Sequence, residues 1–105
     1  MLVIARPSEQ REPALRRARE DPRAFAEFYA RESEPLLVYF ARRTLDAQAA
    51  VDLCAETFAQ AFAGRDRFRG RTEQEARGWL YAAGDVNGRA LLPRMQAVME
   101  VASDA

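Results

Sequence analysis

The chain has 105 residues, which favours a single domain with one hydrophobic core. Its sixteen basic residues, all Arg, are balanced by sixteen acidic ones, so it lacks the basic excess that is typical of a dedicated DNA-binding domain. The absence of His and the single Cys exclude His-based acid–base catalysis, a structural zinc site and an intramolecular disulfide. We therefore expect no catalytic residues, no metal and no cofactor.

Neither end of the chain suggests a membrane. The opening "MLVIARPSEQRE" has four apolar residues before it turns polar, too few for the apolar core of a signal peptide. No segment approaches the roughly 18 apolar residues of a membrane span. These patterns predict a cytoplasmic protein.

The first half of the chain predicts helices. Residues 1–11 are expected to form an N-terminal tail, and residues 12–21 could form a short helix. Asp21 is a good N-cap and Pro22 suits the first helical position of a longer helix. Pro35 should kink or restart that helix, because it removes a backbone donor. The residues predicted to face inward are Phe25, Phe28, Tyr29, Leu36, Leu37 and Phe40.

A helix over residues 47–63 has the clearest period. Asp46 can cap its start and Gly64 should end it. Its apolar stripe consists of Ala50, Leu53, Cys54, Thr57, Phe58, Ala61 and Phe62. Cys54 is interpreted as a small buried hydrophobe.

The last helix is predicted to begin with the capping box "TEQE" at Thr72. Pro93 is expected to end it, so that a domain over residues 12–92 is followed by a C-terminal tail at 93–105, in which a short extra helix is the alternative. The expected stripe consists of Ala76, Trp79, Leu80, Ala83, Val86 or Asn87, Ala90 and Leu91. With no strand pattern, the sequence predicts an all-α fold: a compact bundle of three long helices plus a short leading helix.

An acidic row marks one face of the 47–63 helix: Asp52, Glu56 and Gln60, spaced four residues apart. Like charges at this spacing repel, and no Arg occurs between residues 47 and 63 to offset them. A solvated polar face is the simplest interpretation. The alternative is a docking face for a basic partner helix, for which the neighbouring alanines would leave a flat surface.

The segment "GRDRFRGR", residues 64–71, is the candidate nucleic-acid site, and we call it the arginine loop. Arg can contact phosphate and an aromatic ring can stack on a base. The two Gly residues would make this loop flexible. The competing interpretation is a solvated loop in which Phe68 fills the core. The following "RGWLY" adds Arg77 and Tyr81, an i,i+4 pair that could form a stacking surface or have no particular role. The candidate residues are Arg65, Arg67, Phe68, Arg69, Arg71, Arg77 and Tyr81.

Taken in order, these segments resemble region 2 of the extracytoplasmic-function (ECF) sigma factors of bacterial RNA polymerase. The resemblance runs from about Leu15 to Tyr81. It is carried by the Asp-x-x-x-Glu-x-Phe pattern that starts at Asp52, by "DRF" at residues 66–68 and by "WLY" at residues 79–81.

This resemblance implies a sigma region 2-like fold and a role in transcription initiation. The acidic row would dock on the clamp helices of the polymerase's largest subunit. The arginine loop and the last helix would help to read and melt the promoter −10 element on the non-template strand, and an anti-sigma factor is a possible partner.

The sequence departs from the family at Ala55, where a Gln is usual, and in "AAGDVNG", where Asp85 replaces a basic or polar residue. The second family domain, a helix-turn-helix, is not found. A truncated, split or non-functional sigma factor therefore stays open, as does a protein-interaction module that does not read promoters. A small helical enzyme or ligand-binding bundle is a further alternative, disfavoured by the lack of His.

Overall fold

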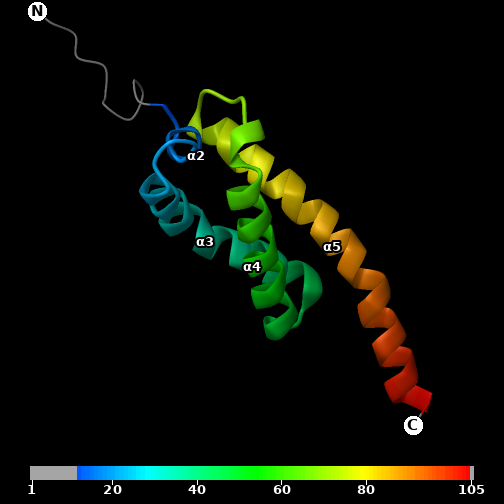
Figure 1. The fold of residues 1–105 in the computed structure, drawn as a ribbon. Helices are drawn as coiled ribbons and strands as arrows, with labels where there is room; N and C mark the ends of the chain where they lie inside the picture. The colour runs from blue at the N-terminus through cyan, green and yellow to red at the C-terminus, as the bar shows by residue number, and fades with distance from the viewer. Residues whose placement is uncertain (1–11, 105) are drawn as a thin grey trace, which may run out of the picture.

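The computed structural model describes the backbone of residues 12–104 and the side chains of residues 12–90. The elements in this part of the chain are α2 (Ala14–Arg17), α3 (Arg23–Thr44), α4 (Ala47–Ala63), the 3-10 helix η1 (Arg65–Arg67) and α5 (Glu73–Asp104). The three long helices pack on one another, and α2 lies at one end of the bundle (Figure 1). The predicted all-α fold is confirmed, while the predicted tail at residues 1–11 lies outside the described residues.

Polar side chains accept hydrogen bonds at the three predicted helix starts, although α3 begins at Arg23, so that Pro22 and not Asp21 takes the N-cap position. Asp21 Oδ1 accepts a hydrogen bond from the backbone N–H of Arg23 at 3.1 Å, and Asp46 Oδ1 accepts one from Ala49 at 3.0 Å. Thr72 Oγ1 accepts one from the N–H of Glu75, also at 3.0 Å. Each bond satisfies a donor that the first turn of a helix leaves unpaired, so these short polar side chains fix where the helices begin.

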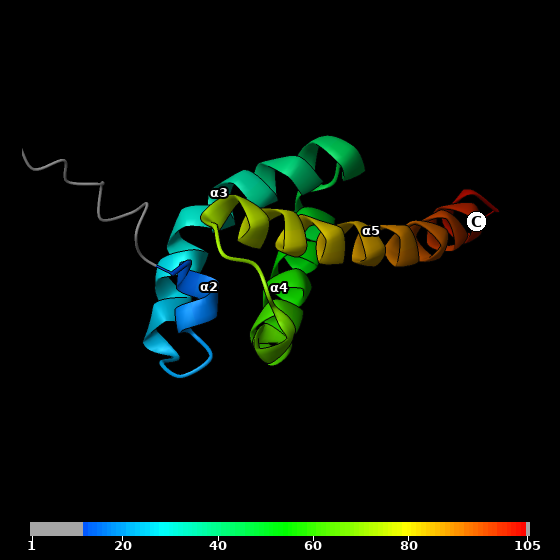
Figure 2. The ribbon, with the colours of Figure 1, turned by 90° about the horizontal axis from the view of Figure 1, so that it is seen from above.

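Pro35 lies inside α3, which stays one helix of 22 residues rather than restarting. Figure 2 shows the two halves of α3 running in different directions. A proline ring removes one hydrogen bond and crowds the preceding turn, which bends a helix without ending it when the flanking residues pack well. Of the two outcomes predicted for Pro35, the structure has the kink.

The predicted end of the last helix at Pro93 is wrong. α5 continues through Pro93 to Asp104 and extends past the other helices (Figure 1). One proline removes a single hydrogen bond, whereas the Leu, Met, Gln and Ala residues on either side of it are good helix formers. Local propensity therefore outweighs the proline, and residues 93–104 continue α5 instead of forming a tail or a separate short helix.

The core lies where α3, α4 and α5 meet, and an aromatic cluster fills it. Phe58 is only 5% exposed and packs edge-to-face on Phe28, with ring centroids 6.2 Å apart. Most of the predicted α4 stripe is thus confirmed, whereas Cys54 and Phe62 are only half-buried. On α5, Val86 is 63% exposed, whereas Asn87 turns inward and its Nδ2 donates to Thr57 Oγ1 at 3.1 Å. Of the two residues left open for this position, Asn87 is the one that faces the bundle.

Candidate functional site

The acidic row forms an exposed line along α4. Asp52, Glu56 and Gln60 all face solvent. Their recorded polar contacts are to amides of the same helix: Gln48 Nε2 donates to Asp52 Oδ1, and Gln60 Nε2 donates to Glu56 Oε1, both at 3.0 Å. Within residues 12–90 no ion pair reaches either carboxylate, although six pairs form elsewhere. The repulsion predicted along this face is therefore not relieved inside the described part of the domain.

Beside the acidic row lie a flat strip of alanines and, next to it, an open pocket. Ala55, Ala59 and Ala63 are exposed along α4. Beyond them an open pocket of about 320 Å³ lies between α3 and α4, with Tyr29 and Val51 in its lining. These two side chains are 51% and 49% exposed, respectively. This apolar edge was missed from the sequence, because the helical period predicts that Tyr29 turns inward with Phe28. An α-helix laid along the alanines would meet carboxylates on one side and apolar side chains on the other.

The first arginine of the arginine loop, Arg65, supports the fold. The Arg65 guanidinium donates to the carbonyls of Ala18 and Phe62, at 2.8 Å each. It also lies 4.0 Å from the centroid of the Phe62 ring, a cation–π geometry. These contacts tie α2 to the C-terminal end of α4, where a cation also suits the carbonyls that the last turn leaves unpaired.

Phe68 is a core residue, as the structural interpretation of the loop predicted. It is 2% exposed and packs on Trp79, with ring centroids 5.7 Å apart. Its ring lies so close to Gly70 that a Cβ there would overlap it, and Glu75 Cβ would be only 2.9 Å away. A glycine is therefore needed at position 70 for close packing against Phe68, and not for the flexibility that was expected.

The other loop arginines face solvent. Arg67, Arg69 and Arg71 are exposed. Arg69 donates to the carbonyl of Asp66 at 2.6 Å, which folds this side chain back on the loop. For Arg67 and Arg71 no side-chain hydrogen bond or ion pair is found within residues 12–90. The loop thus presents fewer available cations than its sequence suggests.

Arg77 and Tyr81 do not form the free surface pair that was considered. Arg77 donates two hydrogen bonds to the carboxylate of Glu32, which is fully buried, at 3.0 and 3.2 Å. The hydrogen bond and charge of Glu32 raise the pKa of Arg77. Tyr81 packs edge-to-face on Tyr39 with ring centroids 4.9 Å apart, and burial raises the pKa of its hydroxyl. No local pattern indicated that Glu32 is buried, since a carboxylate beside an apolar face usually turns outward.

Comparison with known families decides the assignment. The family described as Sigma-70 region 2 matches residues 28–84, more than half of the chain. The chain belongs to this family. Sigma-70 region 2 is a helical domain of transcription initiation. Neither curated proteins nor solved structures give a significant match.

The matched segment of this sigma-70 region 2 domain contains α4, the arginine loop and the first part of α5. It ends at Gly84, immediately before the departure at Asp85. Asp85 Oδ1 accepts a hydrogen bond from the hydroxyl of Tyr39 on α3. The sequence marked Asp85 as unusual but could not supply this partner, which lies 46 residues away in the chain.

The described helices of the domain include none that is both long and apolar enough to cross a bilayer.

Proposed function

We propose that this sigma-70 region 2 domain is of the ECF type and docks through its acidic row on the clamp helices of the polymerase's largest subunit. It would act in the cytoplasm, as a binding domain without catalytic activity. The observation that carries the proposal is the set of exposed carboxylates on α4, which lack ion pairs within residues 12–90. A basic partner helix would relieve their repulsion and steer the encounter.

The proposal includes a part in promoter −10 recognition on the non-template strand. The exposed cations that support it are Arg67, Arg69 and Arg71. Such side chains can bind the phosphates of a single strand without contacting its bases. Arg65, Phe68, Arg77 and Tyr81 would act indirectly, since their contacts lie within the fold.

A second candidate is a protein-interaction module that binds polymerase or an anti-sigma factor and does not read promoters. The favouring observation is the carboxylate of Asp85, which would repel phosphate on α5. DNA binding separates the two candidates, whereas core docking is common to both.

The test of docking is a charge reversal. We expect Asp52→Arg combined with Glu56→Arg to weaken binding to core polymerase by at least tenfold, because removing a charge partner at an interface costs about 2–5 kcal/mol. Both side chains are exposed, so the free energy of unfolding should change by less than about 0.5 kcal/mol. The affinity would be measured by biolayer interferometry with immobilised core enzyme.

Glu20→Arg is the matched control for Glu56→Arg alone, since each replaces an exposed Glu by Arg and changes the charge by the same amount. The Glu20 variant should bind as the wild type does. A folded Asp52→Arg, Glu56→Arg variant with wild-type affinity would rule out docking through the acidic row.

A further inference from the structure

The short helix α2 lies against the arginine loop and is attached to both of its ends (Figure 1). At the start of the loop, Arg65 Nε donates to the carbonyl of Ala18, the C-cap of α2, at 2.8 Å. Near the end of the loop, Arg16 Nη1 donates to the carbonyl of Gly70 at 3.4 Å. The hydrogen bonds to α2 thus lie on either side of Phe68 in the chain.

Glu73, the first residue of α5, makes a third attachment. Its Oε1 accepts a hydrogen bond from the backbone N–H of Ala14 at 2.7 Å, and its Oε2 forms an ion pair with Arg31 Nη1 on α3, also at 2.7 Å. Ala14 begins α2, and Pro13 before it makes no side-chain capping bond. The carboxylate therefore satisfies a donor that the first turn of α2 leaves unpaired, and it joins three helices beside the loop.

The side of α2 that faces these contacts is buried. Ala14, Leu15 and Ala18 are each 0% exposed, and Leu15 belongs to the same core as Phe68. Glu73 is half-buried, so its hydrogen bond to Ala14 is partly shielded from water and is stronger than one at the surface. Together these contacts restrict the conformations that the loop can adopt.

We infer that Glu73 is a positioning residue that acts through α2: it holds the arginine loop in the conformation that presents its exposed arginines to a single strand. These arginines all lie between Arg65 and Glu73 in the chain. Because the loop is ordered before binding, less affinity is lost in ordering it. The inference rests on the DNA contact proposed for the loop, whereas the attachment itself can be measured without DNA.

A matched pair of variants isolates the hydrogen bond. Glu73→Gln and Glu73→Ala remove the same negative charge and the same ion pair with Arg31, and both introduce good helix formers. The glutamine amide oxygen can still accept from the N–H of Ala14, whereas alanine cannot. A difference between the two variants therefore reports the attachment of α2 and not the change of charge.

Amide hydrogen exchange of the full chain, followed by NMR, measures the attachment without DNA. The reporters are the N–H of Ala14, which binds Glu73, and the N–H of Phe68, which is hydrogen-bonded within the loop. Both should exchange about tenfold faster in the alanine variant than in the glutamine variant. The N–H of Ala50, which is bonded to Asp46 in the first turn of α4, should exchange equally in both.

Fluorescence anisotropy with a non-template −10 strand measures the consequence for binding. Glu73→Ala should bind about threefold more weakly than Glu73→Gln, because the loop is no longer ordered in advance. The salt slope should be the same for both, because both keep the same arginines, whereas loss of a phosphate contact would lower the slope.

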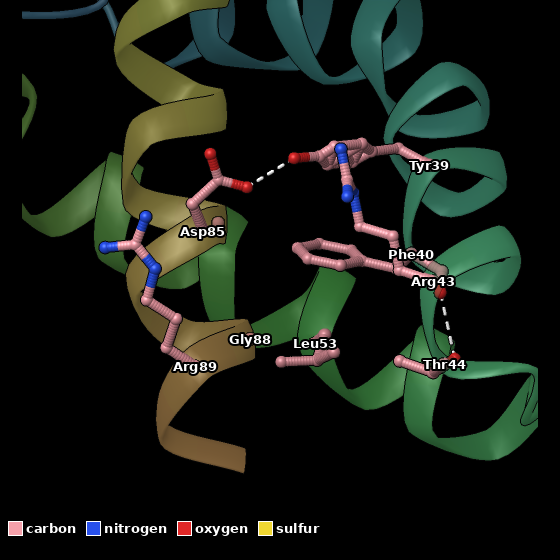
Figure 3. A pocket seen from close by; sticks show the side chains of 9 residues that line it. Tyr39, Phe40, Arg43, Thr44, Leu53, Asp85, Gly88 and Arg89 are labelled. Carbon is pink, nitrogen blue, oxygen red and sulfur yellow. Dashed lines mark hydrogen bonds between the residues drawn. The ribbon is translucent and has the colours of Figure 1, made fainter. Parts of the chain in front are cut away.

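Tyr39→Phe is the control for a general loss of stability. It removes the hydrogen bond from Tyr39 on α3 to Asp85, about 18 Å further along α5 than Glu73 (Figure 3). The charge of the chain does not change, so the affinity for the strand should stay at the wild-type value.

Three results would overturn the inference, and they are distinguishable. Equal exchange in the two Glu73 variants would mean that the loop is held without this hydrogen bond. Faster exchange in the alanine variant with equal affinity would mean that the attachment serves the fold alone. If the wild type itself does not bind the strand, with or without core polymerase, the DNA contact proposed for the loop is wrong and the positioning role falls with it.

Discussion

The acidic row and the arginine loop are both charged segments that the sequence marks as binding sites, yet the fold uses them differently. Within residues 12–90, the polar contacts found for the carboxylates of the row are to amides of their own helix. In the loop, Arg65 bonds to two backbone carbonyls and Phe68 is buried. Charges that the fold does not use remain available for a partner, so the row is the stronger docking candidate, and the DNA contact proposed for the loop falls to its exposed arginines.

Phe68→Ala is the largest expected effect and shows whether the loop is part of the core. We expect a loss of about 3–5 kcal/mol in the free energy of unfolding, because a ring that is 2% exposed leaves a cavity against Trp79. Urea denaturation followed by circular dichroism measures it. A loss below about 1 kcal/mol would place the ring at the surface and return it to the set of residues that could stack on a base.

Arg77→Ala should cost about 3 kcal/mol, since it leaves the buried carboxylate of Glu32 without its cation. Arg71→Ala, at an exposed position six residues earlier, is the matched control and should change stability by less than about 0.5 kcal/mol. The same denaturation series compares them. Equal losses of stability for the two substitutions would mean that the ion pair with Glu32 does not stabilise the fold.

Arg65→Ala and Arg67→Ala sharpen the division within the loop itself. Arg65→Ala removes two hydrogen bonds and a cation–π contact, so we expect a stability loss of about 1–2 kcal/mol. Arg67→Ala should leave stability unchanged but weaken single-stranded DNA binding about two- to fivefold, and lower the salt slope by about 0.7 if it meets one phosphate.

Fluorescence anisotropy with a non-template −10 oligonucleotide and a scrambled strand, with and without core, measures the DNA effect. If Arg67→Ala leaves both affinity and salt slope unchanged, the loop does not contact the strand. Equal binding of both strands in the presence of core would favour the interaction module.

The helices could be predicted from the sequence because caps and periods are local signals. The caps of α4 are Asp46 and Gly64, as predicted. A capping bond and a break in the helical pattern each depend on a few neighbouring residues. The period also placed Phe58 inside and Asp52 outside. Pro93 failed as a stop signal because its neighbours favour the helix.

The rest depends on partners distant in the chain. The contacts of Glu32 with Arg77 and of Tyr39 with Asp85 span 45 and 46 residues, and no local pattern indicates them. A loop has no period, so the burial of Phe68 between exposed arginines could be considered but not decided from "GRDRFRGR" alone. The charge pattern thus indicated where binding residues could lie, and packing determined which of them remain exposed.

Site-specific photo-cross-linking to core polymerase tests the central claim most directly. A photoreactive amino acid is placed at Ala59, beside the acidic row, or at Ala26, an exposed alanine on α3. The account predicts that Ala59 yields an adduct with the largest subunit and that Ala26 yields little or none. Adducts from Ala26 but not from Ala59, formed by folded protein, would contradict docking through this face of α4.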